Sequence, residues 1–485
     1  MKKLTMLLVL AMLLALIASC ARDEVEETTT PTPPADEVTT PAAQEPAVEP
    51  ELEPEEDPPL FEPRDIGRTI RVACWWQYMR ETGEGTPDPA TATNYFLDRL
   101  RYDNQTMLEE TFNVTFTNLV TPQPYIMTNL TASVMAGDPF AEWVMIPRDG
   151  MIAAITGDLV QNIGDFAPPT SDLMTNQMFV EQRVRLFGNL YGFGRADLRI
   201  HGVGLGVNLD LIDATGAPNP VDLFNNGQWT WDAMREVMAI GTQDTTGDGT
   251  TDQFGISGYM GHIIRGLIAS NNGVIVDEDT LQFAMEDPRT LEALEFLSDI
   301  FDNGWWAYDL HGANIMGDWG RNTYFYLEGR SLLFPIQSWM MDEQPADFEF
   351  TIVPFPTGPN ASHYTTIDGF YQAIMIPEGI PNPEDILMLY EELHSWARHE
   401  PAIQREGVYG HMRRVWQTEE CVQRVLHVVS ARDNEKFDLG FAVPQLTWVF
   451  GTFAHYMFHG TQTPMQIIET QRPYRQEMID EAFGR

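Results

Sequence analysis

Strand-like and helix-like patterns of apolar positions alternate along the chain from about residue 67. Residues 69–75 (TIRVACW) are rich in β-branched and aromatic residues and predict a first strand. Residues 96–112 repeat apolar positions at helical spacing, and residues 113–120 (NVTFTNLV) alternate as a second strand would. This β-α-β unit predicts a parallel sheet, whose ligands bind at the carboxyl ends of its strands.

The same patterns predict further elements downstream. Residues 125–136 read as a helix that Gly137-Asp138-Pro139 ends, and residues 143–147 read as a short apolar strand. Trp231, Met234, Val237 and Met238 recur at helical spacing, with an acidic Asp232 in the first turn. We therefore expect a helix from about residue 230 to 242.

The loop that follows this helix, residues 244–255, has the ligand spacing of an EF-hand loop. Asp244, Asp248 and Asp252 occupy positions 1, 5 and 9, and Gly249 occupies the sharp-turn position 6. Position 3 is a threonine and position 12 is Gly255 in place of the usual bidentate glutamate, so we expect weak, structural Ca²⁺ binding. The predicted metal site comprises Asp244, Thr246, Asp248, Thr250, Asp252 and Gln253. The alternative is a solvated loop of Asx turns without metal.

The first nineteen residues have the pattern of a secretory signal. Lys2 and Lys3 precede the apolar residues 4–17, a run too short to span a bilayer comfortably. The sequence Ile17-Ala18-Ser19-Cys20 resembles a bacterial lipobox, in which Cys20 becomes the acylated mature N-terminus. We expect a protein anchored by lipid on the extracellular face of a bacterial membrane. The alternative is a plain secretory signal with Cys20 incidental.

Residues 20–66 are expected to form a disordered tether. Between residues 21 and 65, fifteen acidic residues face only two basic ones, Arg22 and Arg64, and Thr, Pro and Ala fill most of the rest. Such a segment cannot bury a core. Proline and charge repulsion extend it, so it could lift a folded part on the order of 100 Å from the membrane.

The net charge limits the possible partners of the protein, and the chain length indicates how many lobes it forms. The net charge is −42 with 29 Lys and Arg residues and no basic cluster, which argues against nucleic acid or polyanionic partners. A chain of 485 residues exceeds what one core supports, so at least two lobes are expected. Besides Cys20 there are only Cys74 and Cys421, which either bridge or remain buried thiols.

Several ordered segments resemble the extracellular solute-binding proteins of family 1, the receptors of ABC sugar importers. LTASVMAGDP (130–139) and RLFGNLYGF (185–193) resemble their N-lobe, and GLGVNLDLI (204–212) resembles their crossing strand. The later pieces are QWTWD (228–232), FYLEGR (325–330) through Trp339, FTIVPFP (350–356), and 369–377 followed by a helix near Pro383. The resemblance covers roughly residues 67–485. It departs from the family at Glu142, where aspartate is common.

The resemblance implies an α/β, two-lobed periplasmic-binding-protein-like fold of type II, with lobes hinged around a central cleft. The N-lobe would comprise residues 67–199 with 369–432, and the C-lobe 200–365 with 441–485. The chain would cross between the lobes near residues 199–205, 363–368 and 432–441. The implied function is a carbohydrate receptor, for a neutral oligosaccharide, that delivers its ligand to the transmembrane subunits of an ABC permease.

Enzyme signatures are thin in the sequence, and we expect no catalytic residues. There is no G-x-S-x-G, H-E-x-x-H or Walker A motif. His394 and His399 are five residues apart, which is the wrong spacing for two ligands on one helix face. A surface enzyme acting on polysaccharide and a ligand sensor of the same fold remain alternatives.

Aromatic residues near predicted strand ends and loops are the candidates for stacking on sugar rings. Our predicted ligand-binding residues are Trp75, Trp76, Tyr78, Glu142, Asp318, Trp319, Trp339 and Tyr371. Trp305, Trp306, Tyr324, Asp138 and Arg195 are weaker candidates. The alternative for each aromatic residue is a place in the core, and for each polar residue a solvated surface position.

Overall fold

The computed structural model of the 485-residue chain describes most of the region from residue 59 onward. The described residues are 59, 61–80, 85–86, 95–175, 183–194, 202–307, 325–336, 347–365, 367–368, 372–395, 418–430, 439–443, 446 and 448–485. All of them belong to the compact unit Pro54–Arg485. The predicted signal peptide, Cys20 and most of the predicted tether lie outside the described residues.

The first sheet has six strands in the order β2-β1-β3-β13-β5-β4. Its strands are β1 (Arg68–Cys74), β2 (Val114–Val120), β3 (Trp143–Pro147), β4 (Arg183–Leu186), β5 (Asn189–Gly194) and β13 (Gln372–Met375). β1 pairs in parallel with β2 and β3, whereas β13 runs antiparallel to both β3 and β5. The predicted β-α-β units are thus confirmed, and a strand from far along the chain completes the sheet.

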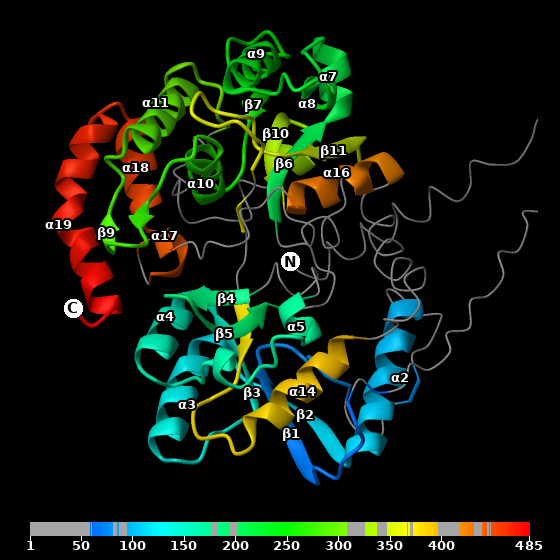
Figure 1. Cartoon of the computed structure of the whole chain (residues 1–485). Coiled ribbons are helices and arrows are strands. Elements are labelled where there is room, and N and C mark those ends of the chain that lie inside the picture. The colour runs from blue at the N-terminus through cyan, green and yellow to red at the C-terminus, as the bar shows by residue number, and fades with distance from the viewer. Residues whose placement is uncertain are drawn as a thin grey trace, which may run out of the picture. The chain divides into compact units, whose positions relative to one another are not determined.

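Helices cover both faces of this sheet: α3 and α4 lie on one side, and α2 and α14 on the other (Figure 1). The helical elements are α2 (Tyr95–Phe112), α3 (Gln123–Met135), α4 (Arg148–Thr156), η1 (Ile163–Asp165), α5 (Asp172–Thr175) and α14 (Pro383–His394). The strands β1 and β3 are buried on both faces, as parallel strands between helices must be. Ile70, Val72 and Cys74 face one core cluster, while Ala73 joins the other.

The second sheet has the order β11-β6-β10-β7, with β12 also paired to β6. Its strands are β6 (Gly202–Asn208), β7 (Phe254–Ile256), β10 (Ser331–Ile336), β11 (Phe350–Val353) and β12 (Ile367–Asp368), and β8 (Val276–Asp277) and β9 (Gln282–Phe283) form a separate hairpin. β6 is antiparallel to β10, β11 and β12, and β7 is parallel to β10.

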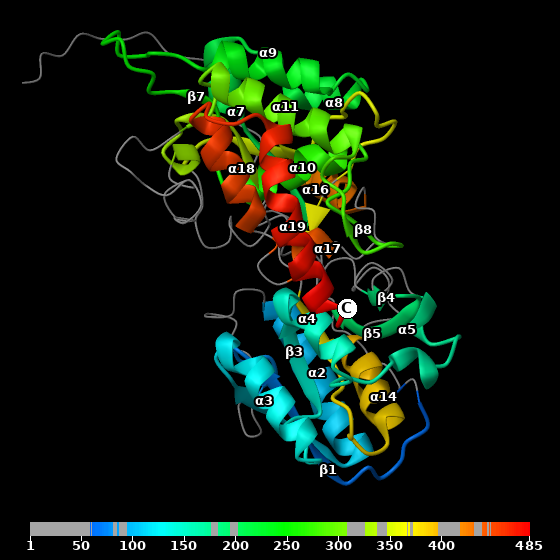
Figure 2. The same ribbon diagram turned by 90° about the vertical axis from the view of Figure 1, so that its left-hand side faces the viewer.

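The remaining helices are α7 (Leu209–Thr215), α8 (Pro220–Asn225), α9 (Trp231–Gly241), α10 (Met260–Ser270), α11 (Pro288–Asp302), α16 (Glu419–Ser430), α17 (Leu439–Ala442), α18 (Trp448–Phe458) and α19 (Pro464–Ala482). α17 and one part of α19 contact α4, beside the first sheet. α18 packs against α10, α11 and α19, and the four helices gather in one group (Figure 2). The predicted helix at 230–242 is confirmed as α9, which begins where the Thr230 side chain accepts a hydrogen bond from the Ala233 N–H.

Two expected boundaries differ in the structure. The expected crossing strand at 204–212 ends at Asn208, because the Asn208 side chain accepts from the Leu211 N–H and starts α7. The segment 369–432 was expected with the N-lobe. β13 and α14 do pack in the first sheet's layers, but α16 packs against β6 and β11 of the second sheet.

Residues before the predicted tether end at residue 66 make contacts with the first sheet's layers. The Phe61 N–H donates to the Glu392 carboxylate at 2.9 Å, Arg64 pairs with Asp385, and Phe61 and Ile66 pack against the first sheet's core. Composition missed this because the two apolar side chains stand among acidic residues and prolines. Within the described part of the chain, no helix has both the length and the hydrophobicity that crossing a membrane requires.

Candidate functional site

The carboxyl ends of β1 and β3 lie at the edge of the first sheet where α/β folds of this topology bind ligands. From β1 the chain moves through α2 to β2 on one side, and then returns through α3 to β3 on the other side of β1. This reversal of strand order is a topological switch point, where connections leave in opposite directions and open a crevice. We call the strand ends around Cys74 and Pro147 the first edge.

Trp75 and Trp76 lie at this edge, directly after β1. Both are half-buried, and their rings meet edge to face with centroids 4.8 Å apart at 85°. Trp75 packs against both core clusters, whereas Trp76 packs only against the one that contains Val72. Trp76 is therefore the better candidate for stacking on a ligand, because less of its surface serves the core.

The backbone N–H and the hydroxyl of Tyr78 both contact other residues of the protein. Its backbone N–H donates to Asn118 Oδ1 at 2.8 Å, and its hydroxyl lies 2.8 Å from His394 Nε2. His394 Nδ1 lies 2.8 Å from the carbonyl of Tyr390 and carries a proton, so both nitrogens of the imidazole have partners within the protein. We therefore exclude Tyr78 from the candidate ligand-binding residues.

Gln372 is a polar residue at the first edge that the sequence analysis missed. It is the first residue of β13, opposite Pro147 of β3, and its side chain is only 8% exposed. Its Oε1 is buried and has no hydrogen-bond partner among the described residues. A buried acceptor without a hydrogen-bond partner destabilises the folded protein unless a ligand donates a hydrogen bond to it. The sequence favours the neighbouring Tyr371 instead, because of its aromatic ring.

The second sheet has a comparable edge at the carboxyl ends of β7 and β10. Ser257 follows β7, is fully buried, and has a hydroxyl with no hydrogen-bond partner in the described part of the chain. Gly258 has φ of +118°, and an added Cβ would lie 2.6 Å from Pro335 Cδ, so only glycine fits this turn. The half-buried Tyr259 then begins α10 without a side-chain cap. We call residues 257–259 the second edge.

Two short connections tie these edges together. Between Asp368 of β12 and Gln372 of β13 only three residues intervene, and between Gly194 of β5 and Gly202 of β6 only seven. Four Cα steps reach at most about 14 Å, so the first connection holds the strand ends of the two sheets close. Asp368 pairs with Gly202 on the second sheet, and Ala373 pairs with Gly194 on the first. Of the crossings expected near 199–205 and 363–368, the described parts pair as β6 and β12, whereas most of 432–441 lies outside the described residues.

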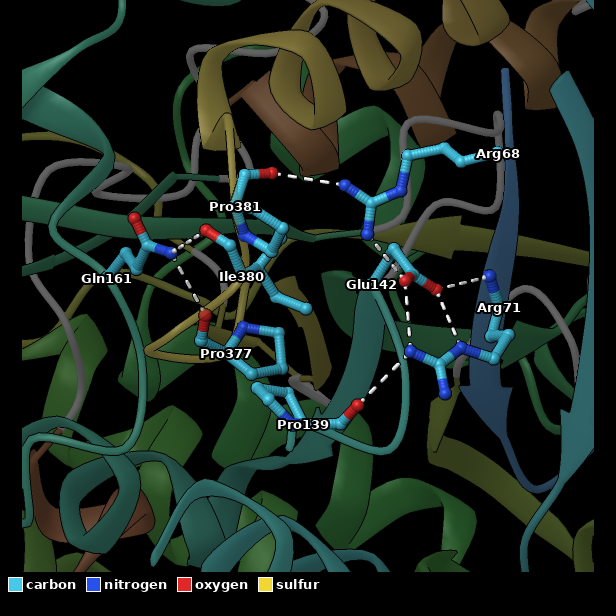
Figure 3. A network of polar contacts seen from close by, with 8 residues as sticks. All are labelled: Arg68, Arg71, Pro139, Glu142, Gln161, Pro377, Ile380 and Pro381. Atoms are coloured by element: carbon cyan, nitrogen blue, oxygen red, sulfur yellow. Dashed lines mark hydrogen bonds and ion pairs between the residues drawn. The ribbon is translucent and has the colours of Figure 1, made fainter. Parts of the chain in front are cut away.

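Glu142 was predicted to bind ligand, and the structure places it elsewhere. It precedes β3, at the amino ends of the parallel strands and therefore away from the first edge. Its carboxylate, 2% exposed, accepts from Arg68 at 2.8 Å and from Arg71 at 3.0 Å, and also from the Arg71 backbone N–H at 2.7 Å (Figure 3). These contacts occupy the carboxylate, so its role is to join β1 to β3.

The electrostatics agree with this structural role. Burial alone would raise the pKa of Glu142, but hydrogen bonds from Arg71 and Arg68 outweigh it and hold the pKa below its usual value. The same contact raises the pKa of Arg71. The exposed Asp138 lies close enough to add to this effect on Arg71, so it too belongs with the amino ends.

The remaining candidates divide into two groups. Trp306 is 4% exposed and packs edge to face on Phe301, and Trp305 is half-buried against the core, so the core alternative holds for both. The others lie outside the described residues: Asp318, Trp319, Trp339, Tyr371, Tyr324 and Arg195.

The predicted calcium loop is closed by its own hydrogen bonds. The Asp244 carboxylate accepts from the backbone N–H groups of Gly247 and Gly249, each at 2.7 Å, and Asp252 accepts from Thr245 at 2.9 Å. Asp248 accepts from the Thr250 N–H, and Gln253 donates to the carbonyl of Gly241. The Gly249 N–H is the main cause that lowers the pKa of Asp244. Among the described residues, no three His, Cys, Asp or Glu side chains are arranged to hold a metal ion.

Gly255 explains why position 12 of this loop lacks its carboxylate. It lies in β7 against α9, and an added Cβ would come within 2.6 Å of the Met238 Cα. No side chain fits there without moving the helix backbone. The strongest ligand of an EF-hand loop is therefore excluded by packing, while the three aspartates remain exposed or half-buried.

Calcium binding in this loop stays a prediction, and it has a direct test. With no position-12 carboxylate, the dissociation constant should be about 10⁻⁴ M or weaker. Titration calorimetry of metal-stripped protein should show heat that Asp248→Ala abolishes, with Asp279→Ala as an exposed control in another loop. Absence of heat at millimolar Ca²⁺ would establish the Asx-turn alternative.

No family model and no curated protein sequence matches this chain. Solved structures do match. The cyclic α-maltosyl-1,6-maltose binding protein of Arthrobacter globiformis superposes with a TM-score of 0.60 at 14% identity, covering 85% of this chain and 99% of its own. The chain has the fold of the two-lobed ABC sugar-binding proteins.

Two further structures extend this likeness. An ABC substrate-binding protein of Listeria monocytogenes, in complex with cycloalternan, gives a TM-score of 0.57 at 13% identity, covering 86% of this chain and 99% of its own. The maltose/maltodextrin-binding domain of Bdellovibrio bacteriovorus, bound to maltotriose, gives 0.54 at 13% identity, covering 86% and 100%. At these identities the likeness establishes the fold, and the α/β two-lobed prediction is confirmed.

Proposed function

We propose that this protein is a carbohydrate receptor that binds a neutral oligosaccharide between the first and second edges and releases it unchanged. The observation that carries the proposal is the pair of edges, which lie at the ends of strands that follow one another closely in sequence. Half-buried aromatic side chains lie at these edges, together with buried polar groups that have no hydrogen-bond partner among the described residues. Trp76 and Tyr259 offer ring faces for the C–H faces of sugars, and Gln372 and Ser257 offer hydrogen-bonding atoms for hydroxyl groups.

Charge favours a neutral ligand. The net charge is −42, and the acidic surface repels anionic ligands at long range. Structures of the same fold are bound to maltotriose and to cycloalternan, both neutral sugars, which supports the same class of ligand here.

The receptor would hand its sugar to the transmembrane subunits of an ABC permease and stay on the outer face of the membrane through lipid on Cys20. Acyl chains contribute about 0.8 kcal/mol for each buried methylene, so a diacyl anchor holds a protein stably. Cys20→Ala should move the protein from the membrane fraction to the medium or leave the precursor uncleaved. Normal processing with unchanged membrane association would remove the anchor from the proposal.

A capture experiment separates the receptor from the enzyme alternative. The protein is incubated with a mixture of neutral oligosaccharides, freed of unbound sugar by gel filtration and denatured, and the released carbohydrate is analysed by mass spectrometry. A receptor yields one or a few sugars at their original length in about equimolar amount. Shortened products would indicate a hydrolase, and recovery of no sugar from any mixture would overturn carbohydrate binding.

A further inference from the structure

Two histidines lie one helical turn apart at the carboxyl end of α18. His455 is in the last turn of the helix, and His459 directly follows it, with the His459 N–H donating to the His455 carbonyl at 3.3 Å. Side chains at i and i+4 share one helix face. Both residues are exposed, and their ring centroids are 4.8 Å apart.

This separation suits two imidazoles on one metal ion. A nitrogen–metal bond of about 2.0 to 2.1 Å places each ring centroid roughly 3 Å from the metal. At angles between square and tetrahedral, two such rings have centroids on the order of 4.5 to 5.2 Å apart. The observed centroid separation of 4.8 Å falls in that interval, so the spacing of the two rings is compatible with a chelate.

The surroundings also favour a cation. The carboxyl end of a helix carries partial negative charge from its last carbonyl groups, and the chain has a net charge of −42. The ring of Phe458, next to His459, packs edge to face on Phe301 at 5.5 Å, which fixes this end of the helix against α11. α18 and α19 lie side by side in this helix group (Figure 2).

We propose that His455 and His459 form a two-histidine chelate for a borderline divalent transition metal, Zn²⁺, Ni²⁺ or Cu²⁺. Imidazole suits these ions, whereas Ca²⁺ and Mg²⁺ prefer oxygen ligands. Since no third His, Cys, Asp or Glu joins the pair among the described residues, water or a ligand from another molecule completes the coordination shell. The bound ion is therefore exchangeable and open to an added ligand.

The test uses the untagged, metal-stripped mature protein, titrated with Zn²⁺ by calorimetry. Removing either imidazole turns a chelate into a single ligand and loses the gain from a second ligand held at high effective concentration. His455→Ala and His459→Ala should each weaken Zn²⁺ binding by at least about tenfold. His363→Ala, which removes an exposed histidine in another loop, should leave binding unchanged.

A rescue variant distinguishes ligation from mere packing of the two rings. His459→Cys supplies a thiolate, which also ligates Zn²⁺, and should restore binding that His459→Ala lacks when a phosphine reductant keeps the thiol reduced. Circular dichroism without metal verifies that every variant is folded. Wild-type protein that takes up no Zn²⁺ at millimolar concentration, or alanine variants that bind as the wild type does, would overturn the site.

Discussion

Glu142→Ala is expected to lower the free energy of unfolding by about 3 kcal/mol. Breaking a buried ion pair from one side typically costs about 3 to 5 kcal/mol, since a charge is left without its partner. The side chains of Arg68 and Arg71 are 23% and 37% exposed in the wild-type structure, so in the variant water can solvate their charges. This solvation places the expected destabilisation at the lower end of that range. Urea denaturation of the wild type and the variant at pH 7 measures the difference.

The destabilisation should depend on pH with a defined sign. The pKa of Glu142 is lower in the folded protein than in the unfolded chain, where it is about 4.3. Its contribution is then fully present above that unfolded value and lost as pH falls through the folded value. The gap in stability between the wild type and Glu142→Ala should therefore be constant from pH 6 to 8 and shrink below about pH 4.

Asp138→Ala is the matched control. Asp138 lies close to the same arginine but is exposed, so its removal should cost less than about 0.5 kcal/mol. A cost for Glu142→Ala as small as that of the control would show that the ion pairs contribute nothing. Loss of ligand affinity by a fully folded Glu142→Ala protein would return this residue to the binding site.

Local patterns were enough to predict the elements from β1 to β3 of the first sheet, but not the partners of their side chains. β1, α2, β2, α3 and β3 follow one another, and each is specified by its own periodicity, so the parallel sheet could be inferred from residues 69–147. Only the resemblance assigned the segment of β4 and β5, and that of β13, to the same lobe. β13 comes from more than two hundred residues later in the chain.

Glu142 shows the limit of reading a polar residue from sequence. Its partners Arg68 and Arg71 stand 74 and 71 positions earlier, and only the pairing of β1 with β3 brings them together. Gln372 and Ser257 were missed for the converse reason. Each is an ordinary polar residue in sequence. It becomes a candidate only because its oxygen is buried at a strand end without a hydrogen-bond partner in the part of the chain that the structure describes.

The oligosaccharide recovered in the capture experiment should stabilise the folded protein by about 2.7 kcal/mol at one hundred times its dissociation constant. Trp76→Ala should weaken binding by roughly two- to tenfold, since stacking contributes about 0.5 to 1.5 kcal/mol beyond buried area. Trp76→Phe retains a ring face and should recover much of the affinity. Thermal melts across a ligand titration give both the shift and the affinity.

Trp75→Ala and Tyr474→Ala are the comparison variants for this prediction. Trp75 packs against both core clusters, so Trp75→Ala should lower the melting temperature without ligand, whereas Trp76→Ala should lower it less. Tyr474 on α19 is 52% exposed, and Tyr474→Ala should alter neither stability nor affinity appreciably.

If Trp76→Ala binds the sugar as tightly as the wild type while Gln372→Ala and Ser257→Ala also bind normally, the ligand does not lie at these edges. Because the capture experiment identifies a bound sugar independently, that outcome would displace the site and leave the receptor function intact.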